Sequence, residues 1–187
     1  MEDSPVFQRW QEKIPNIWED ILNKPSFSTR LRLGYSQFPS DDGAGGISLG
    51  IEDIFIGKTG LTLSADYQIS FNGDRLSVGT SFHYFLFPLG NYLNFAPMLG
   101  YRYLETQDYA TDGVSLGVRL MLAFSRAGDI SLSQIFVSPA GNDEVGVTTF
   151  SVGYAVTNHL RLSSDLQQQN SPFAKDSRVG FVFEWLL

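Results

Sequence analysis

Charged residues alternate with large apolar residues along much of this chain, and their side chains are the ones best able to do chemistry. Arg30 and Arg32 flank Leu31, and Glu184 directly precedes Trp185. In a β-strand, such alternation puts the charged set on one face and the apolar set on the other. The charged or ionisable residues predicted to share the polar face are Arg30, Arg32, Glu52, Asp66, His83, Arg102, Arg119, Arg161, Asp165, Arg178 and Glu184.

The chemistry open to this set is ion pairing, because buried charges must be paired or hydrated. If the sheet closes on itself, the last strand lies beside the first, and Glu184 should then lie near Arg30 and Arg32. Two interpretations follow. The charges form a structural network, or they form a charged constriction that tunes the passage of ions.

Catalytic chemistry has weaker support in the sequence, because it requires a nucleophile, a base and an orienting group within reach of one another. His83 lies inside a predicted strand and His159 at a predicted tight turn, and we interpret both as structural. The chain has no cysteine, which excludes thiol nucleophiles, disulfides and zinc–thiolate sites. We predict no catalytic residue, no metal site and no cofactor.

The elements that position these side chains are strands. Residues 61–71 show the clearest pattern, with Leu, Leu, Ala, Tyr, Ile and Phe at alternate positions and Thr, Ser, Asp, Gln and Ser between them. The polar face consists mainly of short side chains, whereas a soluble sheet usually exposes long Lys and Glu side chains. Short polar residues suit a narrow, hydrated barrel interior, and the apolar face then contacts lipid.

Composition agrees with a membrane barrel. The 187 residues favour one domain, and the net charge of −7 makes nucleic acid an unsuitable partner. The sequence has no run of about 18 uninterrupted apolar residues, which excludes a membrane-spanning helix. The mean hydropathy of −0.07 is compatible with a membrane barrel, because half of each strand faces a polar interior.

The alternation and the turn residues predict ten strands. Their ranges are 26–38, 47–56, 61–71, 75–87, 92–106, 114–125, 130–137, 145–156, 159–167 and 178–187. The even number places both termini on the periplasmic side of an outer-membrane barrel, with tight turns there and mostly longer loops on the external side. In the second strand, Ile51 and Ile54 break the alternation and predict a one-residue bulge near Asp53.

Residues 1–25 are predicted to form an N-terminal amphipathic helix ahead of a barrel domain at 26–187. Trp10 and Trp18 on its apolar face suit a membrane interface, but packing at the mouth of the barrel or inside it would use the same face. The acidic start differs from a secretory signal, so we expect a mature chain with an added Met1.

Aromatic residues near the strand ends are predicted to form two girdles, because amphipathic rings anchor a barrel at both membrane interfaces. The predicted external girdle contains Phe38, Tyr67, Phe71, Tyr101, Tyr103 and Tyr109, and the periplasmic girdle contains Tyr84, Phe87, Tyr92, Phe124, Tyr154, Phe183 and Trp185. The loop carboxylates Asp41, Asp42, Asp108, Asp112, Asp143 and Glu144 are either solvated charges or ligands for divalent cations that bridge lipopolysaccharide.

The last strand, Gly180-Phe181-Val182-Phe183-Glu184-Trp185-Leu186-Leu187, resembles the carboxy-terminal assembly signal of bacterial outer-membrane β-barrel proteins. That signal usually ends on Phe or Trp, whereas this chain ends on Leu187. The resemblance implies recognition by the barrel-assembly machinery. The helix ahead of the barrel resembles the architecture of the lipid A palmitoyltransferase family, but the loop 39–46 lacks the histidine that this family places there.

Two further enzyme families share the barrel architecture. The lipid A deacylase family places His and Ser close together on a strand, and His159 and Ser163 have the wrong spacing for it. The omptin proteases are ten-stranded and need external Asp and His groups, and the chain has no external His. We therefore transfer no catalytic residue from these families.

Taken together, the sequence predicts an all-β protein: a monomeric, ten-stranded antiparallel transmembrane β-barrel of the bacterial outer membrane with an N-terminal amphipathic helix. Its expected function is structural or that of a narrow passive pore for ions or small solutes, and it is not expected to be an enzyme. Its expected partners are membrane lipid, lipopolysaccharide and the barrel-assembly machinery. Two alternatives remain open, namely a lipid-modifying enzyme of the outer membrane and a soluble ligand-binding barrel with its apolar face inside.

Overall fold

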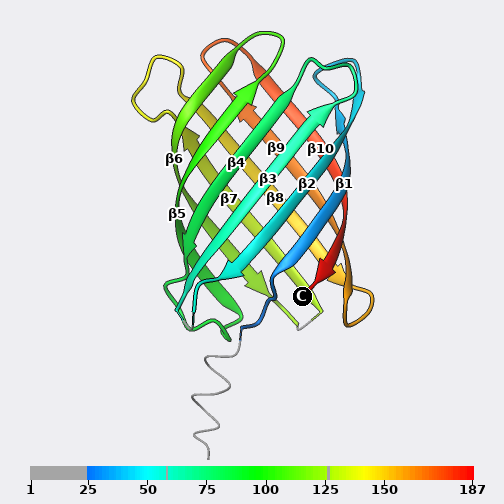
Figure 1. The fold of residues 1–187 in the computed structure, drawn as a ribbon, viewed down its shortest axis with the longest axis vertical. Helices are drawn as coiled ribbons and strands as arrows, with labels where there is room; N and C mark the ends of the chain where they lie inside the picture. The colour runs from blue at the N-terminus through cyan, green and yellow to red at the C-terminus, as the bar shows by residue number, and fades with distance from the viewer. Residues whose placement is uncertain (1–24, 58, 126) are drawn as a thin grey trace, which may run out of the picture.

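Ten antiparallel strands close into a barrel in the computed structural model, which describes residues 25–187 except 58 and 126 (Figure 1). The fold confirms the predicted ten-stranded antiparallel all-β architecture. The predicted helix at 1–25, with Trp10 and Trp18, lies outside the described residues apart from Pro25. The strands are β1 (Arg30–Phe38), β2 (Ala44–Phe55), β3 (Leu61–Ser70), β4 (Leu76–Tyr84), β5 (Leu93–Glu105), β6 (Ala110–Ala123), β7 (Gly128–Val137), β8 (Val145–Ala155), β9 (Leu160–Asn170) and β10 (Lys175–Leu186).

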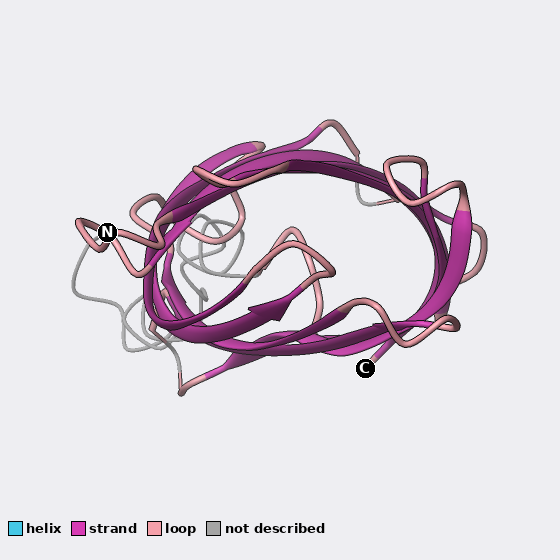
Figure 2. Ribbon diagram, turned by 90° about the horizontal axis from the view of Figure 1, so that it is seen from above, coloured by secondary structure: helices cyan, strands magenta, loops and turns pink. Residues whose placement is uncertain are grey.

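The barrel closes through β1 and β10, which are the strands farthest apart in the sequence. Arg32 pairs with Glu184, and Leu33 pairs with Phe183. Every other strand pairs with its neighbours in the sequence, and the view along the barrel shows a continuous ring (Figure 2). We call the end where β1 begins and β10 ends the base, and the opposite end the mouth.

The outer face of the barrel is apolar. Leu31, Leu33 and Tyr35 of β1 are 45%, 51% and 50% exposed, whereas Arg30 and Ser36, which flank this run with the opposite parity, point inward and are buried. The same alternation continues around the ring, because successive side chains of a strand point to opposite faces. An apolar face turned outward contradicts the alternative of a soluble ligand-binding barrel, which needs that face inside.

The predicted bulge in β2 is confirmed. Between Ile51 and Ile54 the register against β3 shifts, since Ile51 pairs with Ala65 and Ile54 with Leu63. Asp53 occupies the bulge with a φ of 57°, a left-handed conformation that is uncommon for residues other than glycine. Because one extra residue is inserted, Glu52 and Asp53 both make contacts inside the barrel.

The predicted contrast between tight turns and long loops is wrong. The longest connection is 85–92 at the base, where the sequence indicated a tight turn at 88–91. At the mouth, the loops predicted at 107–113 and 170–176 are shorter, because β6, β9 and β10 extend into them. Within the described residues, no helix is long and apolar enough to cross a membrane.

Candidate functional site: a charged layer and a cavity in the lumen

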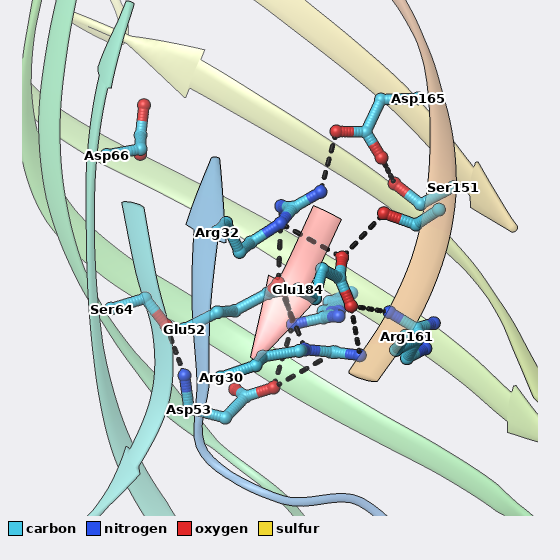
Figure 3. A network of polar contacts seen from close by, with 12 residues as sticks. Arg30, Arg32, Glu52, Asp53, Ser64, Asp66, Ser151, Arg161, Asp165 and Glu184 are labelled. Atoms are coloured by element: carbon cyan, nitrogen blue, oxygen red, sulfur yellow. Dashed lines mark hydrogen bonds and ion pairs between the residues drawn. The ribbon is translucent and has the colours of Figure 1, made fainter. Parts of the chain in front are cut away.

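A connected layer of ion pairs crosses the lumen, and Figure 3 shows its centre around Arg30, Arg32 and Glu184. Its members come from inward-facing positions of the five strands β1, β6, β7, β9 and β10 and from the bulge of β2. They are five arginines and five carboxylates, so the formal charges of the layer cancel. The members of this ion-pair layer are Arg30, Arg32, Arg119, Arg161, Arg178, Glu52, Asp53, Asp129, Asp165 and Glu184.

Glu184 joins the strands at the seam of the barrel. It is 1% exposed, and one carboxylate oxygen accepts a hydrogen bond from Arg161 of β9. The other oxygen accepts a hydrogen bond from Ser163 Oγ at 2.6 Å and lies 3.1 Å from Arg32 Nε. Arg30 Nη1 lies 3.7 Å from the carboxylate. Glu184 therefore links β10 to both of its neighbours, β9 and β1.

Asp53 and Glu52 supply negative charge from β2, the strand that pairs with β1 beside the seam. Asp53 is fully buried, and its carboxylate lies 3.5 Å from Arg30 Nη2 and 3.4 Å from Arg119 Nη1. The backbone N–H of Asp53 donates to Ser64 Oγ at 3.0 Å. Glu52 lies 2.7 Å from Arg119 Nη1 and 3.2 Å from Arg32 Nη1. The bulge thus aims two consecutive carboxylates at three arginines, which an unbroken strand cannot do.

A hydrated cavity lies above the ion-pair layer. Its volume is about 150 Å³, and its lining consists mainly of Ser, Thr, Gln and charged side chains. Arg102 makes a two-armed contact with Asp66 there, at 2.8 and 2.6 Å. The Asp66 side chain is 45% exposed although it belongs to the cavity lining, so water reaches this part of the lumen.

Apolar side chains fill the lumen at the base. Phe27 precedes β1 and packs on the rings of Phe55 and Phe85, with centroids 5.4 and 4.7 Å away. Met121 and Ala96 complete this cluster. Toward the mouth, a second inward-facing cluster on β5, β7 and β8 includes Leu104, Val137, Val145 and Val147. The ion-pair layer therefore separates the polar cavity from the apolar cluster at the base, and apolar groups partly bound the cavity at the mouth.

The charged residues predicted for the polar face all lie in the lumen. Arg30, Arg32, Glu52, Arg119, Arg161, Asp165, Arg178 and Glu184 belong to the ion-pair layer, and Asp66 and Arg102 line the cavity above it. His83 is also inward, with Nδ1 3.3 Å from Asp53 Oδ1. Sequence reasoning missed Asp53 and Asp129 as members. The polar alternation Asp129, Ser131, Ser133 was visible, but the strand was predicted to begin at Ile130.

The predicted girdle aromatics divide into two groups. Tyr67, Tyr84, Tyr101, Tyr154 and Trp185 are exposed on the outer face, and Tyr103 is partly exposed. Phe38 and Tyr109 were wrongly predicted to lie on the external girdle, because both are buried inside the barrel. Phe38 stacks under the Arg75 guanidinium at 5.1 Å, and the Tyr109 hydroxyl donates to Gln169 Oε1 at 3.1 Å.

No protein-family model matches the chain, and no curated protein matches its sequence. Among solved structures, the chain is similar to the KdgM porin, at 10% sequence identity and a TM-score of 0.48, over 84% of this chain and 99% of that chain. It is also similar to Neisserial surface protein A, at 13% identity and a TM-score of 0.29, over 87% of this chain and 97% of that chain.

The described residues have the build of a bacterial outer-membrane β-barrel. The strands are antiparallel and close without an edge, and the outer face carries Leu, Phe, Tyr and Trp. The interior carries short polar residues and paired charges. A spanning sheet in lipid must satisfy all its backbone hydrogen bonds internally, and closure through β1 and β10 achieves this.

Proposed function

We propose that this chain is a narrow passive pore for ions or small solutes in the bacterial outer membrane. The observation that carries the proposal is the lumen, in which a hydrated polar cavity of about 150 Å³ ends on a charge-balanced ion-pair layer. Charged constrictions of this kind select solutes by size and charge. The passage of a solute through them uses no catalytic group.

The packing of the lumen limits what can pass. Arg30, Asp53 and Glu184 of the ion-pair layer are 2%, 0% and 1% exposed, and Phe27 closes the lumen below them. Solutes must therefore be small, and their passage requires displacement of side chains at the base. We place the base in the periplasm, as an even number of strands requires, and the outer face in contact with lipid and lipopolysaccharide.

The assembly of this monomeric barrel is proposed to depend on β10. The alternate residues Phe181, Phe183 and Trp185 are 61%, 60% and 56% exposed on its outer face. This exposed aromatic stripe, with the seam that β10 forms with β1, supports recognition of the last strand by the barrel-assembly machinery.

The pore is tested by conductance in planar lipid bilayers with the full chain refolded in detergent. We expect small, discrete steps for the wild type. The Glu52→Gln variant removes one negative charge from the ion-pair layer and should shift selectivity toward anions, because the layer then carries a net positive charge. The matched control is Asp108→Asn, which removes the same charge from an exposed loop at the mouth.

The pore proposal fails if the wild type gives no discrete conductance above the lipid control. The second candidate function, that of a closed structural barrel, would then be supported. The near-complete burial of Arg30 and Glu184 favours this candidate, because side chains buried to this degree leave little room for a solute. For a closed barrel, we expect a heat-dependent shift in electrophoretic mobility without any conductance.

A further inference from the structure

Three side chains of the lumen form a hydrogen-bonded relay that the proposed pore does not use. Ser81 Oγ lies 2.9 Å from His83 Nε2, and His83 Nδ1 lies 3.3 Å from Asp53 Oδ1. The neutral tautomer with its proton on Nδ1 satisfies both contacts, because Nδ1–H then donates to the carboxylate and Nε2 accepts from the hydroxyl. This order of serine, histidine and carboxylate is that of an activated serine nucleophile.

The sequence places the first two members on one strand and the third on another. Ser81 and His83 are two residues apart in β4, so both point into the lumen. Asp53 reaches His83 because the bulge in β2 turns it inward with a φ of 57°. Strained non-glycine residues and bulges concentrate at functional sites, where they re-aim a side chain.

The carboxylate is held firmly. Thr62 Oγ1 donates to Asp53 Oδ1 at 3.2 Å, and the backbone N–H of Asp53 donates to Ser64. Asp53 and His83 are 0% and 3% exposed. A buried carboxylate that also accepts from a neighbouring hydroxyl keeps the imidazole in one tautomer and orientation, which a general base requires.

Ser81 and His83 both line the hydrated cavity of about 150 Å³, so a substrate in the cavity can reach them. A cavity of about this volume holds a molecule the size of benzene, which limits the acyl group to a few carbons. Arg119 lines the same cavity, and its guanidinium lies 3.4 Å from Asp53. Arg119 also pairs with Glu52 at 2.7 Å, and a guanidinium that lines the cavity is the kind of donor that stabilises an oxyanion.

We propose that Ser81, His83 and Asp53 form a hydrolytic site in the barrel lumen that cleaves carboxylic esters with a short acyl group. Ser81 Oγ attacks the carbonyl carbon while His83 Nε2 takes the hydroxyl proton. The bond to the alkoxy oxygen breaks, and His83 returns the proton to the leaving alcohol. Water then attacks the carbonyl carbon of the acyl–Ser81 ester and gives a proton to His83. The bond from that carbon to Ser81 Oγ breaks, His83 returns the proton to Oγ, and the carboxylic acid leaves.

This site does not depend on the pore, since a closed barrel with an accessible cavity can hold it equally well. It departs from the expectation, drawn from sequence, that the chain is not an enzyme. From sequence, His159 and Ser163 have the wrong spacing for the deacylase pair, and the position of His83 inside a strand indicated a structural role. The inward orientation of Asp53 depends on the bulge. Asp53 lies on β2 and His83 on β4, with β3 between them, so residue spacing in the sequence does not predict their contact.

The experiment uses the detergent-refolded full chain with p-nitrophenyl acetate as the substrate and a fluorophosphonate as a covalent serine probe. The variants are Ser81→Ala and His83→Gln, and the matched control is Ser115→Ala, because Ser115 is buried to a similar degree but does not line the cavity. Each variant is first checked for the heat-dependent mobility shift of the folded barrel.

We expect hydrolysis by the wild type and by Ser115→Ala, and a loss of about a hundredfold or more in Ser81→Ala and His83→Gln. Mass spectrometry should show a fluorophosphonate adduct on Ser81. Asp53 is a positioning residue that does not line the cavity, so Asp53→Asn should lower kcat and leave KM unchanged.

The proposal is overturned if the wild type hydrolyses the ester no faster than buffer with detergent, if Ser81→Ala keeps the wild-type rate, or if the adduct forms on another residue. If Ser81→Ala does not fold, the wild-type adduct decides, because labelling of Ser81 supports the site and its absence overturns it. Conductance plays no part in these readouts, so failure of the pore and failure of the hydrolytic site are distinguishable.

Discussion

Replacement of Glu184 by glutamine removes the charge at the seam of the barrel while it keeps the volume of the side chain. Glu184 is 1% exposed, and its closest contacts are the hydrogen bonds from Arg161 and from Ser163 Oγ. Arg30 and Arg32 keep other carboxylate partners in the variant. The loss is therefore concentrated on Arg161, whose remaining carboxylate partner among the described residues is Asp129, at 2.6 Å.

The expected magnitude follows from these contacts. A hydrogen bond to a charged group contributes about 1.5–3 kcal/mol, and removal of one partner of a buried ion pair costs about 3–5 kcal/mol. Because Arg161 keeps one carboxylate, we expect Glu184→Gln to lower the free energy of unfolding by about 3 kcal/mol, the lower end of that range. Glu184→Ala should lower it further, because it also leaves a cavity.

The assay is equilibrium unfolding by urea of the refolded barrel in lipid vesicles, followed by tryptophan fluorescence. The control is Asp66→Asn, because the Asp66 side chain is 45% exposed and its pair with Arg102 is hydrated. Pairs in contact with water contribute about 0.2–1 kcal/mol, so this variant should lose about 1 kcal/mol or less. Equal losses for Glu184→Gln and Asp66→Asn would refute the reasoning, because burial would then not set the strength of the pairs.

Three further predictions address the base, the mouth and the wall of the barrel. Phe27→Ala opens the apolar cluster at the base and should raise single-channel conductance in planar bilayers, whereas an unchanged conductance would show that Phe27 does not limit passage. The hydrogen bond from Asn72, and after it the contact with Arg75, hold the pKa of Asp41 below its usual value. The stabilisation that ionised Asp41 provides is therefore present at neutral pH and is lost as the pH falls through that lowered pKa. Amide hydrogen exchange in loop 39–43 should therefore accelerate in acid, and Asn72→Ala should weaken this pH dependence. A Cβ at position 153 would overlap the Arg161 guanidinium, so Gly153→Ala should destabilise the barrel by about 1–3 kcal/mol in urea unfolding, and full stability would show that Arg161 moves aside freely.

Periodicity carried most of the sequence prediction. The strand period of two identified the inward charges, and the break between Ile51 and Ile54 located the bulge, because each is a property of a single strand. For Phe38, residue type led to the wrong prediction of a position on the outer face. It has the same parity as Arg30 and Ser36, which face inward, but its aromatic ring suggested the membrane interface.

Other features could not be predicted because they depend on contacts between distant strands. The stacking of Arg75 on Phe38 brings together a loop and a strand that the sequence does not link. Tyr109 bonds Gln169, 60 residues away. Loop lengths were also overestimated, because the strand pairing of β6, β9 and β10 continues through polar residues such as Lys175 that resemble loop composition.

The ion-pair layer at the seam helps to set the register in which β1 and β10 pair. A slip of two residues between β1 and β10 keeps Leu31, Leu33 and Phe183 facing outward, so lipid does not distinguish the slipped pairing from the native one. The charges do distinguish it, since the slip moves Glu184 away from Arg32, its partner in the native pairing. Lipid therefore specifies only which face of each strand points outward, and the buried charges specify which residues meet when the first and last strands join.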